Sequence, residues 1–202
     1  MKETIDVERT FGALVLAGGS ARRMEGRNKA LLELDRRTFL SYLEEALGDF
    51  EEKLLSTRDP VLAEGTGFLP IPDRTAGLGP LEGLRQALTV CRSDALVVSA
   101  CDTPLFSAEL ARFLVRSLGE SDLLVCRDRQ GGVHPLCGVY TKNCLPAIES
   151  LLSSGERRVR RVLDLVPATV LSLADTPFPD RLLFNVNTPQ ELETLLNIKE
   201  LT

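Results

Sequence analysis

The chain has 202 residues, of which 44% are hydrophobic and 26% charged, and a formal net charge of −5. A chain of this length and apolar content can bury one core, so we expect a single domain over residues 1–202. The acidic balance disfavours a nucleic-acid-binding protein, and the polar first ten residues and short apolar runs disfavour a signal peptide or a membrane span, so the expected location is the cytoplasm.

The first half of the chain alternates short apolar runs with helical patterns. Residues 12–18 read GALVLAG, which is typical of a strand buried on both faces. Leucines at helical spacing after Thr38 predict a helix over 40–47, and KLLST predicts a strand at 53–57. Another short strand is predicted at 67–71, before a loop rich in glycine and proline and a helix that begins near Leu81.

The second half continues this alternation. ALVVSA at residues 95–100 is the most hydrophobic strand candidate, and it ends just before Asp102 and a helix predicted from about Ser107 to Leu118. The remaining predicted strands cover residues 122–126, 133–140, 169–173 and 182–185, and the remaining helices cover 145–152 and 190–198. Five cysteines, none at C-x-x-C spacing, favour buried reduced thiols over zinc sites or disulfides.

This order of elements predicts an α/β fold, a Rossmann-like three-layer sandwich in which helices cover both faces of a mostly parallel sheet. In such sheets ligands bind outside the carboxyl ends of the strands, where loops and helix N-termini present free backbone donors. Both glycine-rich loops and the Asp102 turn follow predicted strands. We therefore expect them to meet at that edge.

The clearest chemical motif is LAGGSARRMEGRNK at residues 16–29, a strand that runs into a glycine turn and a cationic stretch. Glycines let the backbone approach an anion, and Arg23 and Lys29 supply charge that offsets a polyphosphate. The alternative is a strand-ending turn with solvated cations. Neither G-x-x-x-x-G-K-[ST] nor G-x-G-x-x-G occurs here, which disfavours a P-loop NTPase or a dehydrogenase.

This segment resembles the LAGG-x-x-x-RM-x-G-x-x-K signature of the molybdenum cofactor guanylyltransferases, members of a nucleotide-diphosphosugar transferase-like superfamily. Further matches follow in the family's order along nearly the whole chain. They are Asp73 with GPLEG at 79–83, CDTP at 101–104, HPL at 134–136, GERRV at 155–159 and FNVNTP at 184–189. Glu25 and Asn28 depart from the glycine and aspartate that are common in the family, which changes the charge pattern of the first loop. Ser56 falls near a position where some members have an asparagine that contacts the nucleotide.

The resemblance implies transfer of GMP from GTP to the phosphate of molybdopterin, with release of pyrophosphate and with Mg²⁺ as cofactor. The Gly18-Gly19 pair favours GTP over CTP within the superfamily. The implied catalytic residues are Lys29, Arg23 and Asp102. The implied nucleotide-binding residues are Leu16, Ala17, Gly18, Gly19, Lys29, Asp73, Gly79, Pro80 and Asp102. Transient contacts with cofactor-insertion proteins or molybdoenzymes are also implied.

Asp102 is the candidate metal ligand. A carboxylate at the end of a central strand can hold Mg²⁺, which takes one or two carboxylates together with substrate phosphates. The alternative is an N-cap for the following helix, a role that Ser107 can fill equally well. Asp73 either contacts GTP or is a simple turn residue, and Gly79-Pro80 either lines the base and ribose or only begins a helix.

The acceptor-binding residues implied by the resemblance are His134, Arg157, Arg158, Asn185 and Asn187. His134 is either a substrate contact or a structural residue, because proton transfer is not the difficult step when a phosphate is already an anionic nucleophile. The alternative for the two arginines is that they do not bind the acceptor and only form a solvated helix face. The alternative for the two asparagines is that they only shape a turn and cap the helix that starts at 188–189.

Two rival functions stay open. One is a cytidylyltransferase or sugar-phosphate nucleotidyltransferase of the same superfamily, which nucleotide and acceptor preference would separate. The other is a non-catalytic GTP-binding protein that delivers the cofactor, against which the retention of Lys29 and Asp102 argues.

Overall fold

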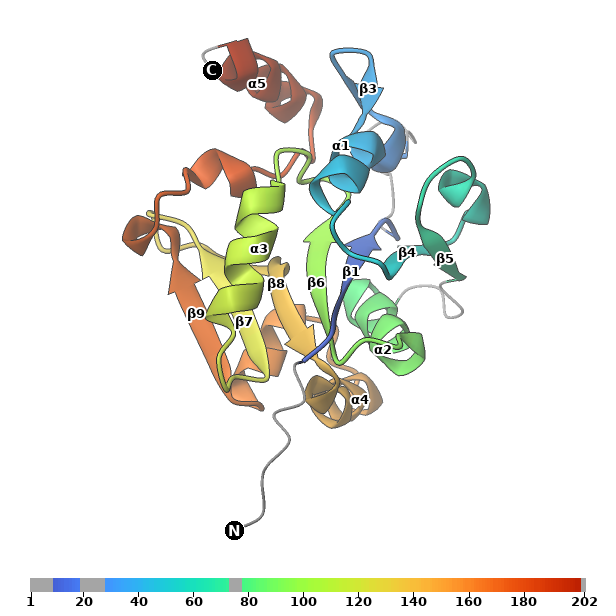
Figure 1. The fold of residues 1–202 in the computed structure, drawn as a ribbon, viewed down its shortest axis with the longest axis vertical. Helices are drawn as coiled ribbons and strands as arrows, with labels where there is room; N and C mark the ends of the chain where they lie inside the picture. Colours follow the sequence, from blue (N-terminus) through green and yellow to red (C-terminus); the bar gives the residue numbers. More distant parts are fainter. Residues whose placement is uncertain (1–8, 19–27, 73–77, 201–202) are drawn as a thin grey trace.

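The computed structural model describes residues 9–18, 28–72 and 78–200. In this part of the chain seven strands form one sheet, in the order β5-β4-β1-β6-β8-β7-β9 (Figure 1). The strands are β1 (Phe11–Leu16), β4 (Lys53–Thr57), β5 (Leu69–Pro72), β6 (Ala95–Ala100), β7 (Leu123–Arg127), β8 (Val133–Thr141) and β9 (Ala168–Ser172). A two-stranded hairpin, β2 (Glu33–Leu34) and β3 (Arg37–Thr38), lies outside this sheet.

The sheet is mostly parallel, as predicted. β1 pairs in parallel with β4 and β6, β4 with β5, and β7 with β9. β8 is the exception, because it runs antiparallel to both β6 and β7. The amino end of β8 therefore lies at the edge where β6 and β7 have their carboxyl ends.

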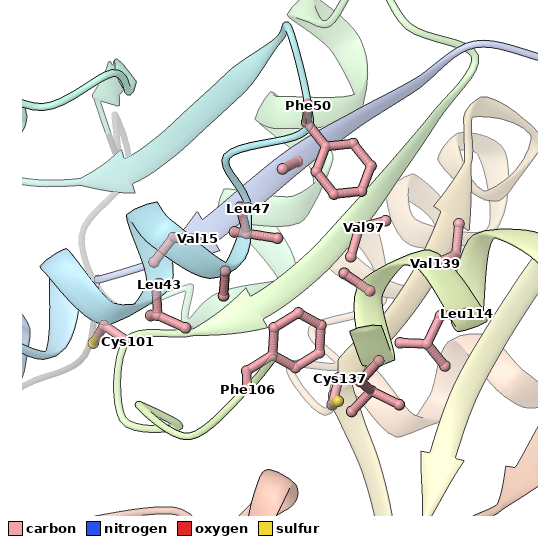
Figure 2. Packing of buried hydrophobic residues seen from close by; sticks show 14 of the residues in the cluster. Val15, Leu43, Leu47, Phe50, Val97, Cys101, Phe106, Leu114, Cys137 and Val139 are labelled. Carbon is pink, nitrogen blue, oxygen red and sulfur yellow. The ribbon is translucent and has the colours of Figure 1, made fainter. Parts of the chain in front are cut away.

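Helices cover both faces of the sheet. On one face α1 (Phe39–Ala46) and α3 (Ala108–Ser117) pack over the strands, and Figure 2 shows side chains of this core. On the other face lie α2 (Pro80–Val90) and α4 (Leu145–Ser153). Ala13 and Val15 of β1 enter the first core, whereas Leu14 and Leu16 enter the second. Burial on both faces explains why β1 is a continuous apolar run.

Local signals place the helix starts. Thr38 caps α1 and Ser107 caps α3, each through its side-chain oxygen. The helix α5 (Pro189–Glu200) begins with a capping box, in which Glu191 N donates to Thr188 Oγ1 and Thr188 N donates to Glu191 Oε2. The described helices include none that is long and apolar enough to cross a bilayer.

One predicted strand is wrong. Residues 182–185 do not join the sheet, because the short 3₁₀ helix η7 (Asp180–Leu183) includes the first two of them. Its hydrogen bonds close locally, from Leu182 N to Pro179 O and from Phe184 N to Arg181 O. A short apolar run has the same pattern in a strand and in a turn that buries one leucine, and Leu183 is that buried side chain. The other predicted strands are confirmed with small shifts at their ends.

All five cysteines are free and buried, as predicted. Burial raises the pKa of the Cys91 thiol to about 11 and that of Cys101 to about 12. A thiol with so high a pKa is a poor nucleophile at neutral pH, so neither of these two cysteines is a candidate for covalent catalysis.

Glu52 is a buried acid that holds the turn between α2 and β6. Its carboxylate accepts hydrogen bonds from Arg92 N at 2.8 Å, Ser93 N at 2.9 Å and Ser93 Oγ at 2.6 Å. Burial by itself raises the pKa of the Glu52 carboxyl, but these hydrogen bonds outweigh it and leave the pKa below 4.5. The ionised carboxylate therefore stabilises the fold.

We expect Glu52→Gln to lower the free energy of unfolding at pH 7 by about 1–3 kcal/mol, because an amide matches these donors less well. The folded-state pKa is lowered, so this contribution is present above the unfolded value and is lost as the pH falls through the folded value. Urea unfolding of the wild-type and Glu52→Gln proteins at pH 7 and near pH 4 measures this contribution. A difference in their free energies of unfolding that stays constant with pH would contradict the assignment.

Candidate functional site

The carboxyl ends of β1 and β6 form the centre of the site. The two strands are parallel neighbours, with Leu16 opposite Ala100, and Cys101 N donates to Leu16 O at 3.0 Å. Asp102 is the second residue after the end of β6, and Lys29 reaches it from the segment after β1, with Lys29 Nζ 3.1 Å from Asp102 Oδ2. Both side chains are less than one-fifth exposed, so the pair is only partly open to solvent.

The carboxyl-terminal segment docks on the same turn. Val186 N donates to Asp102 O at 2.8 Å, and Lys29 Nζ donates to Asn187 Oδ1 at 2.5 Å. Next to them Thr103 Oγ1 donates to Asn185 Oδ1 at 2.8 Å. Segments more than 150 residues apart in the chain therefore meet at one point. Below we call Lys29, Asp102 and Asn187 the lysine cluster.

The lysine cluster has capacity left for a ligand. An ammonium group has three N–H donors, and its contacts with Asp102 and Asn187 use two of them. Oδ2 of the Asp102 carboxylate accepts the hydrogen bond from Lys29, and no described residue hydrogen-bonds to Oδ1. The arrangement can present one N–H to a phosphate oxygen and one carboxylate oxygen to a cation.

The donor set at Asp102 fits Mg²⁺. Within the described ranges, no group of three or more His, Cys, Asp or Glu side chains gathers in a way that could hold a metal. A single strand-end carboxylate suits a hard cation whose other ligands are substrate phosphates and water. The alternative role of Asp102 as a helix cap is wrong, because Ser107 Oγ accepts the hydrogen bond from Leu110 N and so caps α3.

The N-terminus of α2 lies over the ends of β1 and β4. Gly79 has φ +70° and Pro80 is the first helical residue, as the sequence predicts for a loop-to-helix entry. A Cβ on Gly83 would lie 2.4 Å from Ser56 Oγ and 2.9 Å from Leu16 Cδ2. The glycine therefore allows α2 to approach the strand ends closely, and Ser56 is part of that contact.

Several predicted ligands are only partly placed. Leu16 ends β1, and Ala17 N donates to Ser56 O at 2.8 Å, so the contact with β4 continues one residue past the end of β1. Gly19, Arg23 and Asp73 lie outside the described residues, as does Glu25, and their roles stay predictions. Asn28 accepts a hydrogen bond from Ala30 N and caps the turn that begins at Lys29.

The structure brings two of the predicted acceptor residues together. His134 and Asn185 line one pocket of about 170 Å³, which also includes Thr103, Leu136 and Leu183. Thr103 is adjacent to Asp102 in the chain, so this pocket borders the lysine cluster. Asn187 belongs instead to the lysine cluster itself.

The two predicted arginines are engaged elsewhere. Arg157 Nη1 donates to Leu152 O and Glu156 O, both at 3.1 Å, and Arg158 pairs with the Glu156 carboxylate. Arg158 lowers the pKa of Glu156 to about 2. Among the described contacts none joins either arginine to the lysine cluster. Their role toward an acceptor stays a prediction.

Sequence reasoning missed two residues of the site. Thr103 orients Asn185, and Asp128 Oδ2 lies 2.9 Å from Nε2 of His134. Thr103 lies inside the CDTP motif, but the motif by itself predicts no role for it. The only signal for Asp128 is its place before the Gly131-Gly132 pair, which is typical of a hairpin turn and says nothing about a histidine.

Comparison with known proteins decides the family. The family model described as a MobA-like NTP transferase domain matches residues 13–170. The chain belongs to this family. A relative from Carboxydothermus hydrogenoformans, named as a probable molybdenum cofactor guanylyltransferase, is 34% identical over 91% of this chain and 94% of its own length.

Solved structures of other proteins have the same fold as this chain. Molybdopterin-guanine dinucleotide biosynthesis protein A from Archaeoglobus fulgidus superposes with a TM-score of 0.78 at 23% identity, over 95% of this chain and 100% of that one. A Mycobacterium tuberculosis protein solved as a complex with manganese has a TM-score of 0.65 at 20% identity, over 93% and 98% of the two chains. At these identities the likeness concerns the fold alone.

Proposed function

We propose that this protein transfers GMP from GTP to the phosphate of molybdopterin, forming the guanine dinucleotide cofactor and releasing pyrophosphate. Family membership and the name of the relative that is 34% identical support the reaction. The observation in the molecule that supports it best is the Lys29–Asp102 pair at the adjoining carboxyl ends of β1 and β6. This is where open α/β sheets bind nucleotides.

The amino-terminal half supplies the nucleotide side of the proposed site. Lys29 directs its remaining N–H to a phosphate oxygen of GTP, while Leu16, Ala17, Gly18 and Gly19 offer backbone groups to the triphosphate. Gly79 and Pro80 at the start of α2 line the base and ribose. Arg23 adds a second positive charge and Asp73 a contact with GTP.

Asp102 is the proposed ligand of Mg²⁺. When bound, the ion supplies Lewis-acid stabilisation of the charge that spreads over the phosphates in the transition state. Lys29 neutralises the same charge from the protein side and is held in place by Asp102 and Asn187. The acceptor phosphate is already an anionic nucleophile, so the protein positions the two substrates and needs no covalent intermediate.

A product assay tests the proposal. The protein is incubated with Mg²⁺, molybdopterin and each of the four nucleoside triphosphates in turn, and the products are identified by mass. We expect GTP to be the only one of the four triphosphates that gives a dinucleotide product and pyrophosphate, and the product to be the guanine dinucleotide. A cytidine product would favour the cytidylyltransferase, and GTP binding without pyrophosphate release would favour the cofactor-delivery protein.

The location and the protein partners are part of the same proposal. We assign the reaction to the cytoplasm, where the GTP pool lies, and expect transient contacts with cofactor-insertion proteins or molybdoenzymes that take up the product.

Arg157 and Arg158 are the proposed ligands of the acceptor phosphate.

The two asparagines should have different kinetic roles. Asn187→Ala removes an anchor of Lys29, so we expect kcat to fall about tenfold with little change in the KM for molybdopterin. Asn185→Ala removes a polar group of the neighbouring pocket, so we expect the KM for molybdopterin to rise with GTP affinity unchanged. Calorimetry with GTP and rates against acceptor concentration measure both. Identical effects of the two changes would contradict this division.

A further inference from the structure

Asp128 uses its two carboxylate oxygens for different partners. Oδ1 accepts from Gln130 N at 2.9 Å and from Gly132 N at 2.7 Å, which fixes the hairpin loop between β7 and β8. Oδ2 lies 2.9 Å from His134 Nε2. A Cβ on Gly132 would lie 2.5 Å from Oδ2, so glycine at this position leaves room for the carboxylate to reach the imidazole.

The carboxylate determines which ring nitrogen holds the proton. The His134 N–H, together with the Gly132 and Gln130 N–H groups, outweighs the effect of burial and keeps the pKa of Asp128 below its usual value. An ionised carboxylate only accepts hydrogen bonds, so His134 must donate through Nε2. In the neutral imidazole Nδ1 is then an acceptor and is the ring atom left for a ligand.

The pocket beside His134 suits a flat heterocycle better than a phosphate. Apolar side chains such as Leu136 and Leu183 line it together with Thr103, His134 and Asn185, and no described lysine or arginine does. A phosphate calls for cations, whereas a ring calls for apolar walls and a few polar groups at its edge. Its volume of about 170 Å³ is below the roughly 300–1,000 Å³ of whole-ligand pockets, which matches one ring system of a larger molecule.

Asn185 and His134 offer a ligand in the pocket one hydrogen-bond donor and one hydrogen-bond acceptor. Asn185 Oδ1 already accepts from Thr103 Oγ1, so the amide Nδ2 is the part of Asn185 that can meet a ligand, as a donor. His134 Nδ1 is an acceptor when Nε2 holds the proton. A pterin edge presents both a carbonyl oxygen and N–H groups, so it can satisfy the two at once.

We propose that Asp128 is a positioning residue that keeps the His134 proton on Nε2, and that His134 and Asn185 form the subsite for the pterin ring of the acceptor. The second part rests on the proposed function. Asp128 itself touches no substrate and acts through the imidazole.

Nitrogen NMR tests the first part without any substrate. His134 is the only histidine of the chain, so the imidazole signals of tag-free protein need no assignment by mutation. We expect the Nε2–H tautomer in the wild-type protein at a pH where the ring is neutral. Asp128→Asn keeps a carbonyl oxygen for the loop but can turn its NH₂ toward Nε2, so the proton should move to Nδ1. A wild-type Nδ1–H tautomer, or no change in Asp128→Asn, would overturn the assignment.

Kinetics test whether Asp128 acts through His134. We expect Asp128→Asn and His134→Ala each to raise the KM for molybdopterin about tenfold, with kcat changed less than about twofold and GTP affinity unchanged. Asp128→Asn should add nothing in the His134→Ala background, since the imidazole it positions is gone. An undiminished effect of Asp128→Asn in that background would show that it acts only through the loop.

Asp180→Asn is the matched control. Asp180 holds the same hairpin through Arg129 N and Arg129 Nη1 but has no described contact with His134. Loosening the loop without touching the imidazole should leave the KM for molybdopterin unchanged. A tenfold rise in this control would assign the effect to the loop and overturn the positioning role.

Pterin alone separates this proposal from the proposed function. Its fluorescence should be quenched on binding to the wild-type protein, less so with His134→Ala, and GTP should not compete. Competition by GTP would assign the pocket to the nucleotide and overturn the subsite. Pterin binding without dinucleotide formation would refute the proposed function alone, whereas dinucleotide formation with unaltered pterin binding in His134→Ala would refute the subsite alone.

Discussion

Replacing Asp102 with asparagine is expected to lower the rate of GMP transfer by at least about 100-fold, equivalent to roughly 2.7 kcal/mol of transition-state stabilisation. An amide is a weaker ligand for a hard cation than a carboxylate, and it also takes the charged partner from Lys29. The backbone hydrogen bond from Val186 N to Asp102 O does not involve the Asp102 side chain, so the fold should persist in the variant. Transfer rate at saturating Mg²⁺ and GTP, measured beside the thermal midpoint, checks both statements.

Asp49→Asn is the control for Asp102→Asn. Asp49 pairs with Arg112 on an exposed surface and is more than half exposed, so the same chemical change there should leave the transfer rate unaltered. If folded Asp102→Asn protein kept a rate near that of the wild type, Asp102 would not be the metal ligand.

The largest expected loss of stability is that of Gly138→Ala. A Cβ on Gly138 would lie 2.1 Å from Leu124 O and 2.9 Å from Val125 Cα, and both of these are backbone atoms of β7. The neighbouring strand has to move, because no flexible side chain can yield instead. We expect a loss of about 3 kcal/mol or more, and a fall in the thermal midpoint of roughly 6–12 °C for a chain of this size.

Gly67→Ala provides the matched comparison. A Cβ at Gly67 would meet the end of the Lys53 side chain at 3.1 Å, and that side chain can rotate away. Differential scanning calorimetry of both variants should show a small change for Gly67→Ala and a large one for Gly138→Ala. Equal midpoints for the two variants would mean that β7 and β8 are not packed as closely as described.

Features set by neighbouring residues could be predicted from the sequence. The buried run of β1, the caps at Thr38 and Ser107 and the start of α5 at Thr188 and Pro189 follow from backbone preferences within one element. The same reasoning failed at residues 182–185, where the pattern of apolar residues suits either a strand or a turn, and packing of Leu183 decides for the turn.

By itself the sequence determined that Lys29 and Asp102 follow the strands β1 and β6, and hence that both belong at the edge where an α/β sheet binds ligands. Only the tertiary structure decided which residues join them. The antiparallel direction of β8 brings His134 to that edge, and docking of the carboxyl-terminal segment brings Asn187 to Lys29. Strand direction and long-range docking depend on how whole elements pack, and no local propensity encodes them.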